Sequence, residues 1–427
     1  MPHLTLVALV LGFSSLLNVP DTPALRVGEK LWGIGIALGV LWITARWIAR
    51  LRQEVACSQR WLDRLTLLFH LAYVAAMGVV FWPLEFARIA SVNAHAASWF
   101  AGDDLAVMAM LLLPLMLGWR TMAAPVALET GIAPAVLVWQ QARLTFCLPL
   151  LPTLGISLTD DLFRLSPLAH FPAARGPMCL LVLIGFVLTL PVLLRHTWNT
   201  HRLPAGLARD QISRVLRKYR VQVSEILHWD TQGMMCNAAV SGFLPRLRYL
   251  FVTDELLRRL TPLELAAITA HEAAHFRHRH LVQLAASLAA PVLLLANLSQ
   301  AAESWQLAST VTIPVWGVCC LIAWSVGHRA WARVFEHQAD LTACRGDGGL
   351  GSVSAAAVTT FADALVAIDA APRGDWLHPS PRQRVDFLRR MVDSPSSIRC
   401  FERKLWAWQA GQLIVALLLA ARLIAVS

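Results

Sequence analysis

The stretch that decides the fold runs from Thr261 to His275 and reads Thr-Pro-Leu-Glu-Leu-Ala-Ala-Ile-Thr-Ala-His-Glu-Ala-Ala-His. Thr261 can cap a helix, Pro262 suits the first helical position, and Glu264 lies three residues after the cap. The small apolar residues that follow carry no helix breaker. The pattern therefore predicts a helix that begins at Thr261 and continues through His275.

The two histidines of this stretch are four residues apart. On a helix both imidazoles project from one face, one turn apart, where they can bind a single metal ion. Glu272 lies beside the first of them, within reach of a water molecule at the metal. Polar side chains do not normally interrupt an apolar run without partners. We therefore predict that His271 and His275 bind zinc and that Glu272 is the catalytic base; the alternative is a pair of hydrogen-bonded surface or interface histidines.

The third ligand has to come from another part of the chain. His278 follows on roughly the same face, but three ligands on successive turns would spread over about 10 Å at 1.5 Å per residue, and Zn–N bonds are only about 2.0–2.1 Å long. Glu336 and Asp340, four apart on a probable helix, offer a carboxylate instead. We predict that Glu336 completes the site and leaves a fourth position for water. Asp340 would hydrogen-bond the far nitrogen of a ligating histidine, unless it lies on a solvated helix face.

The composition is that of a membrane protein. Of the 427 residues 57% are hydrophobic and 15% charged, whereas about 25% charged residues is usual for a soluble globule. Eight Cys without a C-x-x-C pair indicate neither a disulfide framework nor a thiolate zinc site. Apolar runs near the 20 residues that cross a bilayer predict six to nine crossings, at 4–19, 31–48, 65–83, 104–119, 142–158, 177–195, 282–300, 307–327 and 405–426.

Two of these runs, 142–158 and 307–327, contain prolines and could be re-entrant or surface-lying segments; the prolines are Pro149, Pro152 and Pro314. The run at 4–19 lacks the basic region and the small-residue cleavage site of a secretory signal. We therefore expect a membrane helix there, with a cleaved signal as the alternative.

The net charge of +10 does not indicate nucleic-acid binding, because the arginines gather beside the apolar runs: Arg46, Arg50, Arg52, Arg60 and Arg64 in one loop, and Arg195, Arg202 and Arg209 in another. Positive loops face the cytoplasm. This rule predicts a multi-pass protein of the cell (inner) membrane, in contact with the lipid bilayer, whose polar region after residue 196 faces the cytoplasm.

The chain divides by composition into transmembrane helices over 1–200, a polar domain over 201–403 interrupted by a membrane hairpin at about 282–327, and a hydrophobic helix over 404–427. Within the polar domain the patterns predict an amphipathic helix at 208–219, an extended segment at 221–229 and a strand at 248–253. The predicted fold class is mainly α: a multi-pass helical membrane protein with a cytoplasmic zincin-like metalloprotease domain that carries a small β-sheet.

Residues 205–390 resemble the M48 family of membrane metalloproteases, the group of the HtpX and Ste24 proteases. The likeness rests on several short motifs, which are Trp229-Asp230-Thr231, Asn237-Ala238, Gly242, Pro245, Arg248-Tyr249, Thr253-Asp254, Ala270 to His280, Glu336-x-x-x-Asp340 and His378-Pro379 with Arg384. It implies the same zinc ligands and base that the residues alone predict. It further implies that His378 stabilises an oxyanion, that Arg384 anchors the site, and that the segment at Asn237 receives the substrate backbone. Without the resemblance, His378 reads as a loop histidine and Arg384 as a solvated or lipid-facing charge.

The predicted function is that of an integral-membrane zinc endopeptidase that binds one Zn²⁺ and hydrolyses polypeptide substrates, mainly membrane or membrane-proximal proteins, in quality control or processing. Zinc would polarise a water and the scissile carbonyl while Glu272 transfers the proton. One alternative is a sensor-transducer protease of the M56 type. The argument against this alternative is that the chain ends soon after its last apolar run. Another is a non-catalytic membrane scaffold or transporter with a structural metal site. The sequence predicts no oligomeric state.

Overall fold

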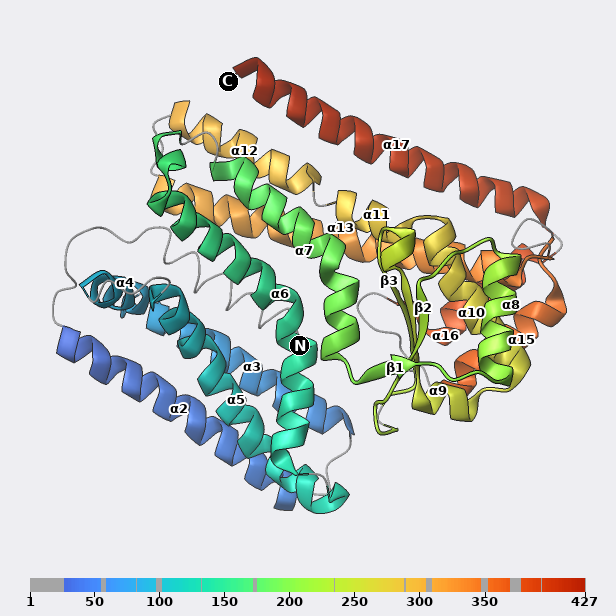
Figure 1. Cartoon of the computed structure of the whole chain (residues 1–427), viewed down its shortest axis with the longest axis horizontal. Coiled ribbons are helices and arrows are strands. Elements are labelled where there is room, and N and C mark those ends of the chain that lie inside the picture. Colours follow the sequence, from blue (N-terminus) through green and yellow to red (C-terminus); the bar gives the residue numbers. More distant parts are fainter. Residues whose placement is uncertain are drawn as a thin grey trace. The chain divides into compact units, whose positions relative to one another are not determined.

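The computed structural model divides into two compact units, Met1–Leu190 and Pro191–Ser427. It describes residues 27–54, 59–81, 83–96, 102–131, 133–171, 175–233, 235–287, 289–304, 309–346, 352–368, 378–392 and 394–426. Figure 1 shows the helices and strands with their labels. The described residues are mainly helical and include a small mixed sheet and several apolar helices, which confirms the predicted fold class in these respects.

The first unit is helical. Its elements are α2 (Val27–Glu54), α3 (Gln59–Phe81), α4 (Phe86–Ala96), α5 (Gly102–Thr130), α6 (Pro134–Leu165), the short η1 (Pro167–His170) and most of α7 (Arg175–Thr197). Helix α5 packs against α2, α4 and α6, and its Leu111 and Leu115 are fully buried together with Phe69 and Tyr73 of α3. The Tyr73 hydroxyl donates to the Leu111 carbonyl at 2.7 Å, so the polar end of this ring is satisfied inside an apolar core.

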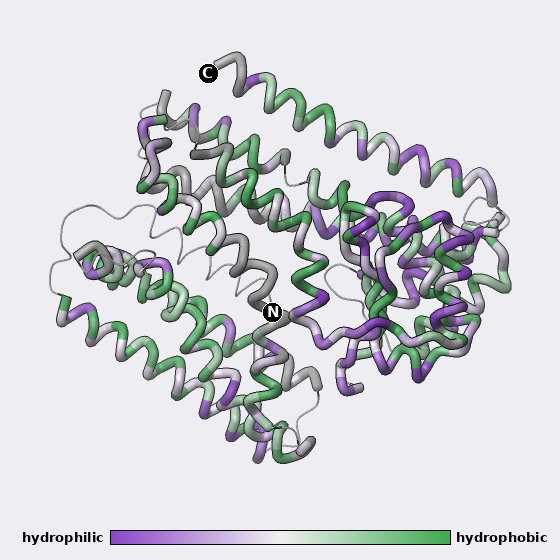
Figure 2. Tube along the Cα trace, in the orientation of Figure 1, coloured by the Kyte–Doolittle hydropathy of each residue, from purple (hydrophilic) through white to green (hydrophobic). Residues whose placement is uncertain are grey.

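Five helices in the described part of the chain are long and apolar enough to cross a membrane: 27–53, 64–81, 102–128, 280–298 and 395–422. Their outer faces carry exposed apolar side chains, among them Trp32 at 79% and Leu418 at 66% exposure, and Figure 2 shows the hydrophobic colouring along these helices. Such faces suit a lipid environment. The run at 4–19, also expected to cross, lies outside the described residues.

The remaining predicted runs are also helical. Residues 142–158 lie within α6, residues 177–195 within α7, and the described part of 307–327 within α13 (Ser309–Cys344). The prolines at 149, 152 and 314 therefore do not end their helices, although proline removes one backbone donor from the helical ladder. These three segments are not among the five candidate spans.

The second unit contains a four-stranded sheet in the order β1-β2-β4-β3. The strands are β1 (Thr200–Arg202), β2 (Glu225–Trp229), β3 (Ala238–Ser241) and β4 (Tyr249–Thr253), and only β2 and β4 are parallel. Every residue of β4 is buried, as its aromatic and β-branched sequence predicts. Strand β3 lies at one edge of this sheet, and among the described residues it pairs only with β4.

Helices cover this sheet and form one core with it. They are α8 (Leu207–Lys218), α9 (Asp254–Arg259), α10 (Pro262–Arg277), α15 (Ala355–Ala367) and α16 (Pro381–Met391). Helix α10 is central, because it packs against α8, α15, α13 and β3. The predicted amphipathic helix corresponds to α8, whose apolar residues Ile212, Val215 and Leu216 are buried.

Among the described residues, the second unit also contains the short η3 (Pro245–Leu247) and the helices α11 (His280–Ala286), α12 (Ala289–Ser304), α13 and α17 (Pro395–Val426). Helix α12 packs against α13 and α17. Helix α13 has 36 residues, about 54 Å at 1.5 Å per residue. It is continuous from its apolar first half to the polar second half that carries Glu336. The position of Glu336 is therefore fixed relative to the apolar first half.

Candidate active site

Helix α10 begins with the predicted capping box. The Thr261 hydroxyl accepts from the Glu264 amide at 3.4 Å, and the Glu264 carboxylate accepts from the Thr261 amide at 2.8 Å. These contacts satisfy amide groups that have no partner within the helix. The start of the helix is thereby fixed, which sets the direction in which His271 and His275 project.

The structure brings three predicted ligands together from two helices. Ligand atoms of His271, His275 and Glu336 all lie within 4.8 Å of one another. Nε2 of His275 is 3.1 Å from Nε2 of His271, and the two Glu336 oxygens lie 3.5 Å from His271 Nε2 and 3.4 Å from His275 Nε2. Two imidazoles and one carboxylate are a ligand set found in zinc enzymes.

A buried oxygen indicates that this cluster suits a cation. Oε2 of Glu336 is buried and makes no hydrogen bond of good geometry among the described residues; Nε2 of His271 and Nη2 of Arg384 each lie 3.5 Å from it, and a buried carboxylate oxygen that is only partly compensated is costly. A metal ion between the two Nε2 atoms and this carboxylate would satisfy it. His271, His275 and Glu336 therefore fit a zinc ion by donor type and by position.

Asp340 and Arg384 support the outer side of the cluster. Asp340, which is fully buried, places Oδ1 2.9 Å from Nδ1 of His271. Arg384 donates two hydrogen bonds to the same carboxylate, from Nε at 2.9 Å and from Nη2 at 2.5 Å. The Arg384 guanidinium also lies over the ring of Phe361, 5.3 Å from its centroid. Asp340 thus contacts the far nitrogen of a histidine, the position that the sequence predicted for it.

Glu272 and His378 are electrostatic neighbours of the cluster. Burial raises the pKa of Glu272 to about 7, and the nearby His271 opposes this shift. His378, whose side chain is 51% exposed, places Nε2 3.7 Å from Oε1 of Glu336. His378 is thus the exposed residue of this pair, whereas Glu272 is more deeply placed.

The charges of the cluster are strongly coupled. Burial lowers the pKa of His271, but Glu336 and Asp340 outweigh it and raise this pKa to about 9. For His275 burial dominates and lowers the pKa to about 3. Burial raises the pKa of Glu336, but the two histidines and Arg384 hold it well below the usual value. Without a metal ion, the cluster thus holds one proton on His271 between ionised carboxylates.

The segment at Asn237 leads into the edge strand β3. Thr253 fixes it from both sides: its amide donates to the Asn237 carbonyl at 3.1 Å, and its hydroxyl accepts from the Asn237 amide at 2.9 Å. Gly242 ends the strand at φ +117°, where a Cβ would lie 2.2 Å from the Leu247 carbonyl oxygen. Only glycine fits this close approach, so the bend that follows the edge strand depends on it.

Several partners of the cluster were not predicted from the sequence. His280 hydrogen-bonds His275, Phe335 stacks on His280 with ring centroids 4.4 Å apart, and Phe361 lies 5.9 Å from the ring of His271. The only signal in the sequence was the general richness in histidine after His275, which gives no contact partner.

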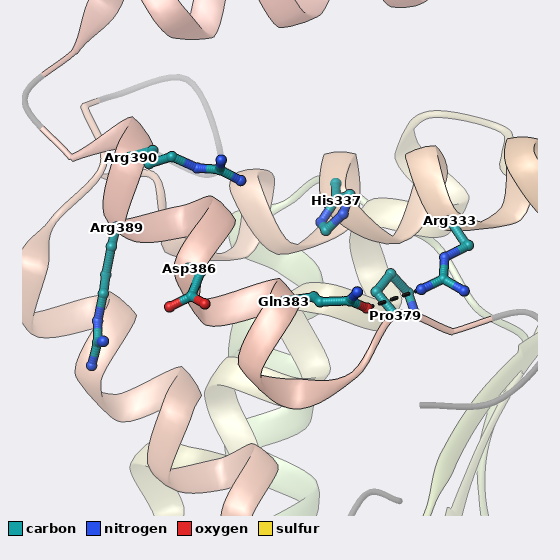
Figure 3. Close-up of a pocket in the computed structure, with 7 residues that line it drawn as sticks. All are labelled: Arg333, His337, Pro379, Gln383, Asp386, Arg389 and Arg390. Atoms are coloured by element: carbon teal, nitrogen blue, oxygen red, sulfur yellow. Dashed lines mark hydrogen bonds between the residues drawn. The ribbon is translucent and has the colours of Figure 1, made fainter. Parts of the chain in front are cut away.

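A pocket has a volume of about 660 Å³, and three of its lining residues are adjacent in sequence to residues of the site. His337 follows Glu336, Pro379 follows His378, and Gln383 precedes Arg384; Asp386, Arg389, Arg390 and Arg333 complete the lining (Figure 3). Arg333 donates to Gln383 at 2.9 Å. The three arginines give the pocket a positive charge.

Comparison with known proteins agrees with this geometry. Residues 205–392 match the model of peptidase family M48 and include all the predicted site residues. The crystal structure of S. mikatae Ste24p is similar in fold, with a TM-score of 0.58 and 14% identity over 86% of this chain and 100% of that one. No curated protein sequence matches the chain. Residues 205–392 are thus similar to peptidase family M48, and the chain also carries apolar helices long enough to cross a membrane.

Proposed function

We propose that the chain is an integral-membrane zinc endopeptidase in which His271, His275 and Glu336 hold the metal. The observation that carries this proposal is the convergence of their ligand atoms, which all lie within 4.8 Å of one another. The match of residues 205–392 to the model of a peptidase family supports the same reading.

Each neighbouring side chain has a distinct task in peptide hydrolysis. A bound zinc ion would supply Lewis-acid activation of water and of the scissile carbonyl. Glu272 accepts the proton of the attacking water and returns it to the leaving amine, a task suited by a pKa near neutrality. His378, beside Glu336 and half exposed, donates a hydrogen bond to the oxyanion. Asp340 and Arg384 hold His271 in place.

The edge strand β3 binds the substrate as an additional strand. Thr253 donates its amide to the Asn237 carbonyl, which makes these two residues a hydrogen-bonded pair of the ladder. Such pairs alternate with pairs whose backbone groups point away from the partner strand. The amides and carbonyls of Ala238 and Val240 therefore face the open edge. Backbone bonds of this kind are indifferent to side chains, so we expect broad sequence specificity.

The membrane helices restrict where substrates are cut. Helix α13 joins an apolar segment to the polar half with Glu336, and α17 continues from the polar domain into another apolar segment. We expect the site to lie near the cytoplasmic face of the cell membrane, because arginines cluster in the loops assigned to that side. Membrane proteins and membrane-proximal segments are then the natural substrates, as in quality control or processing.

Cleavage of β-casein in detergent, together with zinc content by mass spectrometry, tests the proposal. Wild type should contain one zinc per chain and cleave casein, and Glu272→Gln should keep the zinc and lose cleavage. Glu402→Gln is a matched control, because Glu402 is 46% exposed and pairs with Arg345 away from the cluster. Zinc with casein cleavage that does not depend on Glu272 would refute its role, and zinc without any cleavage would favour a scaffold.

A further inference from the structure

We propose that a directional chain of hydrogen bonds fixes the tautomer in which His275 can bind zinc. The chain starts at the main-chain carbonyl of Gln338 and passes through Thr342, His278, the Gln338 side chain and His280 to His275. This inference rests on the proposed function, since it concerns how one of the proposed ligands is prepared.

The contacts form an unbroken series between α10, the turn that follows it, the first residue of α11, and α13. Oγ1 of Thr342 lies 2.8 Å from the Gln338 carbonyl oxygen and 2.9 Å from Nε2 of His278. Nδ1 of His278 lies 3.3 Å from the amide nitrogen of Gln338, whose Oε1 lies 2.9 Å from Nε2 of His280. Nδ1 of His280 lies 2.9 Å from Nδ1 of His275.

The direction of every bond follows from the first one. A carbonyl oxygen can only accept, so the single hydroxyl proton of Thr342 is donated to Gln338. Thr342 Oγ1 must then accept from Nε2–H of His278, which leaves His278 Nδ1 to accept from the Gln338 amide. Oε1 of Gln338 accepts from Nε2–H of His280.

The same direction reaches the ligand. His280 has its proton on Nε2, so its Nδ1 accepts from Nδ1–H of His275. Nε2 of His275 then carries a lone pair and no proton, and Nε2 is the atom that faces His271 and Glu336. If the chain ran the other way, His275 would carry its proton on Nε2 and could not bind a metal there. The polarity of the chain thus selects the competent tautomer.

This arrangement explains an asymmetry between the two histidine ligands. Nδ1 of His271 meets the carboxylate of Asp340, an obligatory acceptor when ionised, whereas Nδ1 of His275 meets another imidazole, which can donate or accept. An imidazole fixes a tautomer only if its own proton is fixed. The bonds beyond His280 supply that constraint.

The backbone and the core hold His280 in register. Arg279 adopts the left-handed conformation at φ +56°, which turns the chain between α10 and α11 so that His280 returns beneath His275. His280 is 1% exposed and stacks on Phe335, the residue before Glu336, with an interplanar angle of 7°. The chain therefore also ties the helix of the histidine ligands to the helix of the carboxylate ligand.

Zinc affinity, measured by competition with a chromophoric chelator, tests this inference. His280→Phe keeps the ring that stacks on Phe335 but removes the acceptor, and loss of such a partner weakens metal binding about 10- to 100-fold. Thr342→Val removes only the hydroxyl at the far end and should weaken zinc binding about three- to tenfold, the order of one net hydrogen bond. Thr342→Ser keeps the hydroxyl and should match wild type.

His201→Phe provides the control, because His201 also hydrogen-bonds another histidine, His228, but on the sheet; its zinc affinity should be unchanged. Thermal unfolding of the zinc-free proteins identifies variants that do not fold. If His280→Phe is one of them, the comparison of Thr342→Val with Thr342→Ser tests the inference instead. Equal zinc affinity of Thr342→Val and Thr342→Ser, or wild-type affinity of folded His280→Phe, would overturn the inference. Failure of wild type itself to bind zinc would instead refute the proposed function.

Discussion

Asp340 and His271, which lie on α13 and α10, meet with 2.9 Å between Oδ1 and Nδ1, inside a shell where Asp340 is fully buried. The contact fixes the ring of His271 so that Nε2 faces His275 and Glu336. It also connects His271 to Arg384 through Asp340, because Arg384 donates two hydrogen bonds to the Asp340 carboxylate. The order of the site therefore depends on residues that are not themselves predicted ligands.

Asp340→Asn tests this contact with almost no change in shape. The amide is a weaker acceptor for His271 and a poorer partner for Arg384. Zinc affinity should fall about 10- to 100-fold, as is usual when the partner of a metal-binding histidine is lost, and chelator competition measures it. Asp386→Asn, at a carboxylate with a 52% exposed side chain, should bind zinc like wild type. Wild-type affinity in Asp340→Asn would contradict the assigned role.

Arg384→Lys tests the bidentate geometry, because lysine keeps the charge but cannot donate two parallel bonds to one carboxylate. We expect casein cleavage to fall about 10-fold or more and the free energy of unfolding to fall by about 1.5–3 kcal/mol, the contribution of a hydrogen bond to a charged group. Activity assays and denaturant unfolding measure the two effects. Arg382→Lys, at a 91% exposed side chain, should change neither the cleavage rate nor the free energy of unfolding. If Arg384→Lys behaved like Arg382→Lys, the bidentate contact of Arg384 would have no role in the site.

Val240→Pro tests substrate binding at the edge strand. The substitution removes an amide that faces the open edge and leaves the ladder between β3 and β4 intact. For an extended peptide, kcat/KM should fall about three- to tenfold, the order of one net backbone hydrogen bond, and the zinc content should not change. Val240→Ala keeps the amide and serves as the control. Unchanged kcat/KM in the proline variant would show that substrates bind elsewhere.

Zinc affinity should depend on pH through His271. Its pKa is about 9 without metal, because Glu336 and Asp340 outweigh the effect of burial, and zinc requires the neutral imidazole. Between pH 6.5 and 8.5 the proton must therefore leave when zinc binds. The affinity should fall by up to about tenfold for each unit by which the pH is lowered. Chelator competition at several pH values checks this; an affinity independent of pH would contradict the charge state proposed for the metal-free site.

The sequence predicted the local parts of this site well. The capping box at Thr261 and the four-residue spacing of His271 and His275 act within one helix, so their geometry follows from helical periodicity. Strand β4 was predictable because its residues are buried on both faces. The prediction that residues of α10 and α13 meet at one site rested on the four-residue spacing of Glu336 and Asp340, which indicated a second helix with two carboxylates on one face.

Contacts that depend on tertiary packing were not predictable in this way. Arg384 reaches Asp340 only because α16 packs on α13, and the resemblance to a family, not the spacing, pointed to it. His280 meets His275 because Arg279 adopts a left-handed conformation, which no pattern around it indicates. The prolines at 149, 152 and 314 suggested interrupted segments, yet their helices continue, since neighbouring backbone groups can compensate for one missing donor.

The central claim is that Glu336 completes a metal site with His271 and His275, and the zinc content of purified Glu336→Ala tests it most directly. Wild type and Glu272→Gln should each contain one zinc per chain by mass spectrometry, whereas Glu336→Ala should contain almost none while keeping its helical circular dichroism. A full zinc content in folded Glu336→Ala, or no zinc in wild type, would contradict the account.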